Sequence, residues 1–411
     1  MARNLIAALD VGTSTVQTVV AEKKKGEETL RILGIGMVPS VGIRRGVVVD
    51  LEDAASSIRK SVAEAQRAAG VPVRSVWLNV GGSHISVSSS RGVVAVSRAD
   101  GEISPEDVRR AIAAAETFIP KNPNKEILHM IPRDFKVDHE AGIKDPVGMH
   151  GVRLEVDTLI IECSAPFLKN LFKCVEGAGL RVEDYVFSPL AAADAVLTKR
   201  QKELGVMLLD LGGGTASFMI FEEGVPIHAG VIPIGGNHIT NDVAIGFRTH
   251  VDVAERIKTT HGSCLPSELP KRDTIRLAEF IPDEAGQYSR KELAEIIEAR
   301  LRDIFELLQK ELKKVDRAQL LPAGIVLVGG SVLMPGIVEL TKRELKLPTE
   351  IGCPEEFLNS IDDKVAPAFV PVLGLAKWAG TRVAESRSIL GGHRSSGGEG
   401  TFIRWLRSLL P

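Results

Sequence analysis

The chain has 411 residues, which is enough for two to four domains or subdomains. Its formal net charge is -2 and aromatic residues make up 4%, so neither a basic surface nor stacking aromatics point to nucleic acid, and we expect no nucleic-acid partner. The four cysteines lack CxxC spacing, which favours reduced thiols in a cytosolic compartment over disulfides or a zinc site. We also expect neither a signal peptide nor a membrane span, since no apolar run approaches about 18 residues.

Three strand-like segments each run into a glycine-rich turn. Residues 5–9 lead into DVGTST and a second apolar run, 16–21. Residues 206–209 lead into DLGGGT and 217–221, so both segments predict β-hairpins. Residues 324–328 run into GGS and then MPGI, which predicts a helix start. Because the two hairpins share one pattern about 200 residues apart, they indicate two related halves.

Helical spacing marks three other segments. Residues 52–69 and 183–197 both predict helices, and the second includes the small-residue stretch SPLAAADAV. Residues 290–315 form a long amphipathic pattern. From about 82 to 161, alternating strands surround a helix that Ser104 would cap, which indicates a small α+β domain inserted into the first half.

The two glycine turns suit phosphate groups, because glycine lets backbone N–H groups approach an anion closely. Asp10 and Asp210 end the strands before the turns, where carboxylates can hold Mg²⁺ through water. No lysine follows the glycines, so neither turn is a Walker A loop, and either turn alone would be an ordinary hairpin. Together they predict a nucleotide site, with ATP as the preferred nucleotide. Its phosphate-binding candidates are Gly12, Thr13, Ser14, Thr15, Gly212, Gly213, Gly214 and Thr215.

DVGTST, DLGGGTAS and VLVGGSVLMPG resemble the two phosphate motifs and the adenosine motif of the actin, Hsp70 and sugar-kinase superfamily. SPLAAADAV resembles its connecting helix. The resemblance implies an α/β, actin-like, two-lobed ATPase fold that binds ATP and Mg²⁺. It places Gly329, Gly330 and Ser331 against the adenosine. In VAERIK, Glu255 and Lys258 resemble residues that touch the ribose and adenine, although a solvated helix face would also explain them.

Within the superfamily the chain is most similar to the FtsA family of bacterial cell-division proteins, over nearly its whole length. The resemblance implies a division into subdomains. Residues 1–82 and 164–197 form the first lobe core (1A), 83–163 the inserted subdomain (1C), 198–224 and 321–380 the second lobe core (2A), and 225–320 subdomain 2B. Residues 381–400 form a flexible linker and 401–411 a terminal helix.

The terminal segment is amphipathic when laid on a helix at about 100° per residue. Its apolar side carries Phe402, Ile403, Trp405, Leu406, Leu409 and Leu410, and its polar side carries Thr401, Arg404, Arg407 and Ser408. Two arginines beside bulky apolar residues predict a helix lying on anionic membrane lipids. Docking on the protein's own body is the alternative, which the glycine- and serine-rich linker disfavours.

The resemblance implies a polymerising protein that self-associates into filaments and tethers FtsZ to the cytoplasmic face of the inner membrane at the division site. It would receive the FtsZ C-terminal peptide on residues 225–320, with Arg290, Lys291 and 300–302 as possible contacts, and recruit other division proteins. ATP would act as a conformational switch, with at most slow hydrolysis.

Two alternatives stay open: a PilM-like pilus-assembly protein and a sugar or acetate kinase. Asp194 is the nearest candidate for a catalytic, water-positioning residue, although a structural role suits it better. His84 and His238 follow glycine turns and have a loop role as their simplest explanation.

Overall fold

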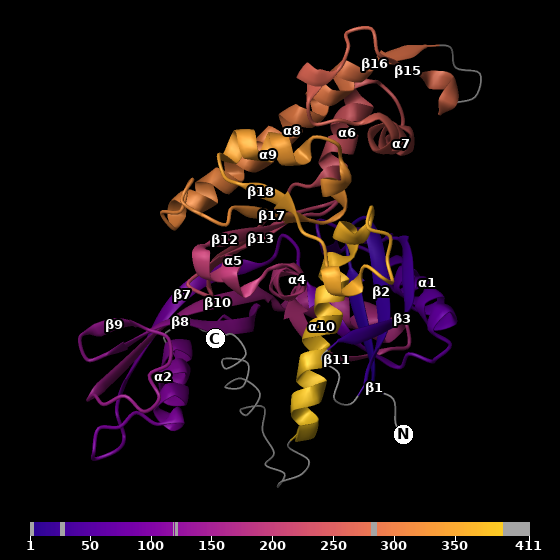
Figure 1. The fold of residues 1–411 in the computed structure, drawn as a ribbon. Coiled ribbons are helices and arrows are strands. Elements are labelled where there is room, and N and C mark those ends of the chain that lie inside the picture. Colours follow the sequence, from indigo (N-terminus) through magenta and orange to yellow (C-terminus); the bar gives the residue numbers. More distant parts are fainter. Residues whose placement is uncertain (1–3, 25–28, 118, 120–121, 281–285, 389–411) are drawn as a thin grey trace.

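Two five-stranded sheets with the same topology form the two lobes of the protein (Figure 1). The computed structural model describes residues 4–24, 29–117, 119, 122–280 and 286–388. The first sheet has the order β11-β6-β1-β2-β3, and the second has the order β14-β13-β12-β17-β18. In each sheet three strands form an antiparallel meander and two more continue in parallel. The predicted internal repeat is therefore present in the fold.

The register of the two hairpins is also the same, because Asp10 pairs with Gln17 and Asp210 pairs with Ser217. The strands of the first sheet are β1 (Asn4–Val11), β2 (Thr15–Lys23), β3 (Leu30–Pro39), β6 (Ser75–Val80) and β11 (Arg181–Phe187). Those of the second are β12 (Val206–Leu211), β13 (Ala216–Glu222), β14 (Val225–Ile232), β17 (Ile325–Val328) and β18 (Thr349–Ile351). A short pair, β4 (Ile43–Arg44) and β5 (Val47–Val48), precedes helix α1.

Helices α4 (Ser188–Val196) and α10 (Ala366–Ser388) lie between the two sheets (Figure 1). Their apolar residues share one core with strands of both lobes. The helices approach so closely that a Cβ added at Gly374 would lie 2.2 Å from the carbonyl oxygen of Ala191. The small residues of α4 thus permit the close packing that SPLAAADAV predicts.

The sequence prediction was wrong at the start of α4 and at the end of α10. Residues 183–187, predicted as helix, belong to strand β11, which pairs in parallel with β6. The helix begins only at Ser188, where Pro189 suits the first turn. At the other end, α10 continues through residues 381–388, which the prediction assigned to the linker. The predicted terminal helix, residues 401–411, lies outside the described residues.

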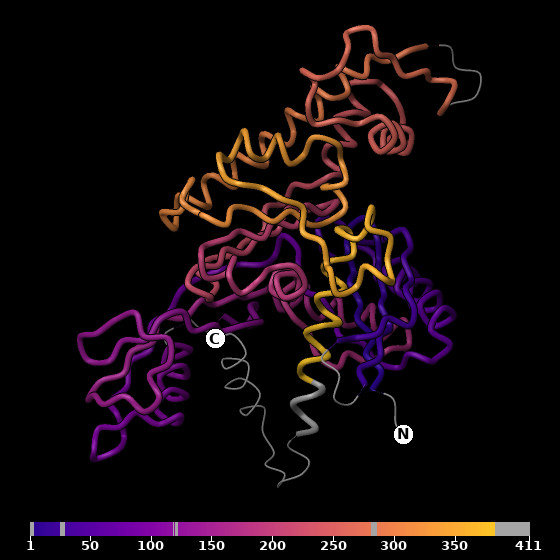
Figure 2. The backbone as a smooth tube through the Cα atoms, in the orientation of Figure 1, coloured from indigo at the N-terminus to yellow at the C-terminus, as the bar shows by residue number. Residues whose placement is uncertain are grey.

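The inserted subdomain is a four-stranded sheet, order β7-β10-β8-β9, with one helix on it, and it extends away from the two lobes (Figure 2). Its elements are β7 (Ser86–Ala95), α2 (Pro105–Thr117), β8 (Lys125–Val137), β9 (Glu140–Ile143) and β10 (Arg153–Ser164). The predicted cap is present, since Asp107 N donates to Ser104 Oγ at 3.3 Å. Two polar contacts reach the second lobe: Arg133 Nη1 donates to the carbonyl of Ile227 at 2.9 Å, and Lys144 pairs with Glu203 at 3.2 Å.

The remaining helices cover the outer parts of both lobes. Helix α1 (Leu51–Ala69) is capped by Asp50, whose side chain accepts from Asp53 N, and packs on β3. The predicted amphipathic helix is α8 (Arg290–Lys314), whose apolar face packs into the second-lobe core. The others are α3 (Ala165–Gly177), α5 (Lys199–Leu204), α6 (Gly236–Gly246), α7 (Val251–His261) and α9 (Ile337–Leu345), with a small pair of strands, β15 (Thr274–Arg276) and β16 (Gln287–Ser289). Among the described residues, none of the helices has the length and apolar character needed to cross a bilayer.

Candidate functional site

A cleft of about 420 Å³ is lined by residues of both lobes. This volume lies in the range of roughly 300–1,000 Å³ that is typical of small-ligand sites. Every nucleotide-binding residue predicted from the sequence lines this one cleft: Asp10, Gly12, Thr13, Ser14, Thr15, Asp210, Gly212, Gly213, Gly214, Thr215, Glu255, Lys258, Gly329, Gly330 and Ser331. Tertiary folding therefore brings together motifs that are separated by up to 321 positions (Asp10 to Ser331).

The two glycine turns are built alike and touch each other. In each, the first glycine donates its N–H to a threonine carbonyl three residues on, Gly12 to Thr15 and Gly212 to Thr215, both at 3.0 Å. A Cβ at Gly213 would lie 1.9 Å from Ser14 Oγ, so no larger residue fits while the turns are in contact. The glycines are therefore required by the close approach of the two lobes.

Asp10 and Asp210 form a pair of acids in the cleft with perturbed proton affinities. Burial raises the pKa of Asp10 to about 6, and the hydrogen bond that Asp10 Oδ1 accepts from Asn79 Nδ2 at 3.0 Å partly offsets this. Burial, and then the charge of Asp10, raise the pKa of Asp210 to about 7. At Asp210 the parallel neighbour is Val328, which offers no side-chain donor. Two such carboxylates favour an arriving cation, which would remove their mutual repulsion.

The polar groups of this part of the cleft fit a hydrated Mg²⁺ ion. Asn79 Oδ1 is a buried acceptor without a hydrogen-bond partner among the described residues. An acceptor of this kind suits a metal-bound water, and Mg²⁺ usually keeps several waters while taking only one or two carboxylates. The set of Asp10, Asp210 and Asn79 thus has the chemistry that such an ion needs.

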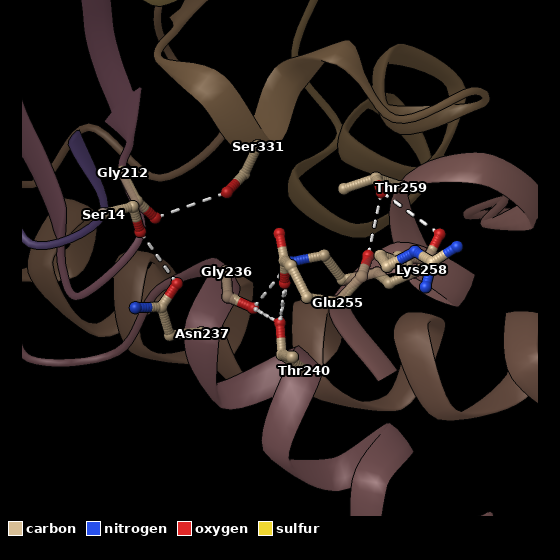
Figure 3. A network of polar contacts seen from close by, with 10 residues as sticks. Ser14, Gly212, Gly236, Asn237, Thr240, Glu255, Lys258, Thr259 and Ser331 are labelled. Atoms are coloured by element: carbon tan, nitrogen blue, oxygen red, sulfur yellow. Dashed lines mark hydrogen bonds and ion pairs between the residues drawn. The ribbon is translucent and has the colours of Figure 1, made fainter. Parts of the chain in front are cut away.

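Helix α7 presents a buried cation at the other end of the cleft (Figure 3). Lys258 is 8% exposed, and its Nζ donates to Thr240 Oγ1 at 2.8 Å and to Glu255 Oε2 at 2.7 Å. It also reaches the carbonyl of Gly236 at 3.3 Å. The face of α7 that carries Glu255 and Lys258 therefore points into the cleft and is not an ordinary solvated surface.

The third motif is held in place by a proline in α10. Pro371 has no N–H, so the carbonyl of Pro367 one turn earlier lacks its usual helical donor. Gly329 N donates to that carbonyl at 2.9 Å. Gly329 has φ 95°, and a Cβ there would lie 2.4 Å from Asp210 Oδ1, so glycine is needed for both reasons. Ser331 Oγ donates to the carbonyl of Gly212 at 3.3 Å and ties this motif to the second turn.

Several polar residues of the cleft were not predicted from the sequence, among them Gln17, Asn79 and Asn237. Gln17 and Asn79 are only 4% exposed, and each interrupts an otherwise apolar strand. A buried polar side chain in an apolar strand is an informative signal that could have singled out both residues. Asn237 follows two glycines at the start of α6, and nothing in its local sequence distinguishes it from a turn residue.

Three weaker candidates lie outside the cleft lining. Asp194 accepts a hydrogen bond from Lys202 Nζ at 3.0 Å, so the structure does not bring it to the two turns. His238 Nδ1 accepts from Gly235 N at 3.1 Å and caps α6. The ring of His84 packs against Phe167. Both histidines thus have structural contacts.

Comparisons with known proteins agree with this architecture. A family model described as cell division protein FtsA matches residues 207–374, and one described as the SHS2 domain inserted in FtsA matches residues 82–162. The chain is 37% identical over 386 residues to cell division protein FtsA of Pseudomonas aeruginosa, covering 94% of this chain and 91% of the relative. It is 40% identical over 377 residues to that of Borreliella burgdorferi, covering 91% of each. With FtsA of Escherichia coli K12 the identity is 33% over 380 residues, covering 91% and 90%.

Solved structures with low sequence identity share the fold. The PilM–PilN type IV pilus biogenesis complex matches with a TM-score of 0.66 and 18% identity, covering 91% of this chain and 98% of the other. MreB5 of Spiroplasma citri bound to ADP matches with a TM-score of 0.53 and 14% identity, covering 94% and 98%. These likenesses, together with the two repeated sheets, show the predicted actin-like fold with its inserted α+β subdomain. On sequence identity over more than nine-tenths of its length, the chain belongs to the FtsA family of cell division proteins.

Proposed function

We propose that this FtsA-family protein binds ATP with Mg²⁺ in the cleft between its lobes and uses the nucleotide as a conformational switch. The observation that carries the proposal is the convergence of both glycine turns, the α7 pair and the third motif on one cleft. MreB5, which shares the fold, has been solved with ADP and with AMPPNP. The chain's own residues divide the binding task between the two ends of the cleft.

At the phosphate end, the glycine turns would offer backbone N–H groups, and Asp10, Asp210 and Asn79 would hold the hydrated metal. The metal would supply positive charge that neutralises both the phosphates and the two carboxylates. At the other end, Glu255 and Lys258 would contact the nucleoside, with Lys258 held in position by Thr240. Because both lobes contribute residues to the phosphate end, bound nucleotide would set the angle between them.

A switch is favoured over a kinase by the small number of titratable groups in the cleft. Among its described lining residues, the acids are Asp10, Asp210 and Glu255, and no histidine is present. Glu255 is already engaged by Lys258 and Thr240. A kinase needs a positioned base and a place for its acceptor, so we expect at most slow hydrolysis. Rapid phosphoryl transfer from ATP to sugars or acetate would overturn this expectation. The likeness to PilM is one of fold, and the family relationship favours division over pilus assembly.

We further propose that the protein is a peripheral membrane protein of the cytoplasmic face at the division site. The support is the amphipathic pattern of residues 401–411, whose two arginines would face anionic lipid headgroups. Each large apolar side chain buried in the lipid contributes ~1.5–3 kcal/mol before ordering costs. One helix of this length binds reversibly, so stable attachment would need several linked copies. Self-assembly into a filament would supply them, and MamK, which shares the fold, has been solved as a double helical filament.

For the FtsZ peptide we propose the 225–320 region on the ground of family membership. The basic residues considered from the sequence already have acidic partners, since Arg290 pairs with Asp273 at 3.0 Å and Arg300 with Asp242 at 2.6 Å. An acidic peptide would therefore have to displace them or bind elsewhere on this subdomain. A pull-down with the FtsZ C-terminal peptide, comparing the intact chain with an Arg300→Ala variant, separates these two modes. Recruitment of other division proteins belongs to the same proposal.

The central experiment pairs nucleotide binding with liposome co-sedimentation. Calorimetric titration of the purified chain with ATP, with and without Mg²⁺, tests the cleft, and absence of binding would refute the switch. Co-sedimentation of the full chain and of a chain ending at Gly400, on anionic and on neutral vesicles, tests the tail. Equal sedimentation of both chains on anionic vesicles would refute the tether. A full-length control with Arg404→Glu and Arg407→Glu separates charge from the mere presence of the segment.

A further inference from the structure

One side-chain contact joins the two lobes directly across the phosphate end of the cleft. Ser14 Oγ donates to Asn237 Oδ1 at 2.9 Å, between residues 223 positions apart (Figure 3). Ser14 belongs to the turn after β1, and Asn237 is the second residue of α6 in the other lobe. The contact therefore links the two lobes at the angle seen in this structure.

The second glycine turn fixes the position of the Ser14–Asn237 pair. Asn237 N donates to the carbonyl of Gly213 at 2.7 Å, which fixes the start of α6 on the turn. A Cβ at Gly213 would lie 1.9 Å from Ser14 Oγ and 3.0 Å from Asn237 Oδ1, so only glycine leaves room for the pair. Backbone geometry thus presents both side chains to the cleft at one point.

The chemistry of the pair suits a phosphate group. Asn237 Nδ2 carries two N–H donors and makes no hydrogen bond within the part of the chain that the structure describes. The Ser14 hydroxyl is a donor that is used only on the Asn237 carbonyl oxygen. Both side chains line the cleft beside the glycine turns. A phosphate inserted between them would receive donors from both lobes, and hydrogen bonds to a charged acceptor are stronger than the neutral one they would replace.

We propose that Asn237 is a positioning residue for the terminal phosphate of a nucleoside triphosphate. In the empty or diphosphate-bound protein, Ser14 and Asn237 bond to each other. In the triphosphate-bound protein, the hydroxyl of Ser14 and Nδ2 of Asn237 both turn to the terminal phosphate, and the direct bond is broken. Asn237 thereby distinguishes triphosphate from diphosphate, and the inference rests on the nucleotide binding proposed above.

Helix α6 gives the contact a route to the rest of the second lobe. Asp242, on the same helix, accepts two hydrogen bonds from Arg300 of α8, at 2.6 and 2.9 Å. A displacement of Asn237 at the start of α6 is therefore passed to α8 through a bidentate ion pair. Binding of the triphosphate would therefore change the position of α8, on the outer part of the second lobe.

The test compares the dissociation constants of Mg²⁺-AMPPNP and Mg²⁺-ADP for the full chain and two variants. Asn237→Asp keeps an acceptor for Ser14 but replaces the amide donor by a charged oxygen. We expect the affinity for AMPPNP to fall about tenfold or more relative to that for ADP. The matched control is Asn241→Asp, the same change at an exposed position one turn further along α6, which should leave the ratio unchanged.

Each outcome decides between the two proposals. If the unaltered chain binds neither nucleotide, the proposed function fails and the inference with it. If it binds both and Asn237→Asp keeps the original ratio, or loses both nucleotides equally while folded, the inference is wrong and nucleotide binding stands. The thermal midpoint of each variant reports folding. Should Asn237→Asp not fold, Ser14→Ala removes the same contact from the other lobe, and an unchanged ratio in that variant would overturn the inference equally.

Discussion

Replacing Asp210 by asparagine should stabilise the nucleotide-free protein while removing its response to Mg²⁺. Asp210 is partly buried beside Asp10, and both burial and that neighbouring charge raise the pKa of Asp210 to about 7 from a model-peptide value of 3.8. The folded state thus holds the proton of Asp210 more tightly than the unfolded state. Stability therefore falls as the pH rises from about 4 to about 7, and the whole penalty is present at pH 8.

The size of the effect follows from the two pKa values. A difference of about 3 pKa units corresponds to about 4 kcal/mol, which is an upper limit on the gain from Asp210→Asn at pH 8. At pH 5 the same linkage leaves about 2 kcal/mol, because most of the folded Asp210 is then protonated while the unfolded form is largely ionised. For a chain of 411 residues that unfolds as one unit, 4 kcal/mol corresponds to about 5 °C in the thermal midpoint.

The assay is thermal unfolding in EDTA at pH 5 and pH 8, repeated at pH 8 with Mg²⁺-ATP. Asp210→Asn should unfold at the higher temperature in EDTA, with the larger difference at pH 8. Addition of Mg²⁺-ATP should raise the midpoint of the unaltered protein and leave that of the variant nearly unchanged, because one carboxylate facing the metal has been lost. Asp194→Asn is the matched control: its carboxylate lies outside the cleft and pairs with Lys202, so it should show no gain.

Two results would refute the reasoning separately. If Asp210→Asn is no more stable than the unaltered chain at pH 8 in EDTA, burial and the charge of Asp10 do not raise the pKa of Asp210 in the folded protein. If Mg²⁺-ATP stabilises the variant as much as the unaltered chain, Asp210 has no part in holding the metal. A gain in the Asp194→Asn control equal to that of the variant would assign the effect to general loss of negative charge.

Gly374→Ala places a Cβ 2.2 Å from the carbonyl oxygen of Ala191, so α4 and α10 must separate, and denaturant unfolding should show a loss of about 1–3 kcal/mol. Gly380→Ala on the same helix meets only flexible side-chain carbons at 3.1 Å or more and should lose less; equal losses would contradict the close packing. Arg133→Met removes the donor to the carbonyl of Ile227, which should speed hydrogen exchange in β14 and lower stability by ~1–3 kcal/mol. Unchanged exchange in β14 would show that this contact does not hold the inserted subdomain on the second lobe.

Local patterns were sufficient where an element is defined by its own neighbours in the chain. The two hairpins were predictable because strand, glycine turn and strand are contiguous, and α8 was predictable because its apolar residues repeat at helical spacing. The strand at 183–187 was misread because its partner, β6, lies about 100 positions earlier, and no local period reveals that pairing. The end of α10 was misplaced although the sequence contained the signal, since residues 381–388 carry no glycine or proline that would stop a helix.

The candidate site, too, has features that could be predicted from local sequence and features that could not. Its glycines, hydroxyl residues and acids stand in short motifs, so the sequence by itself was enough to select them as residues of one site and to show that the two halves repeat one design. The elevated pKa values of Asp10 and Asp210, the orphaned acceptor of Asn79 and the Ser14–Asn237 contact were decided only by the tertiary structure. Each of these depends on burial between two lobes or on a distance between distant residues. Such quantities depend on how α4 and α10 pack the lobes together. They cannot be predicted from a short motif in one lobe.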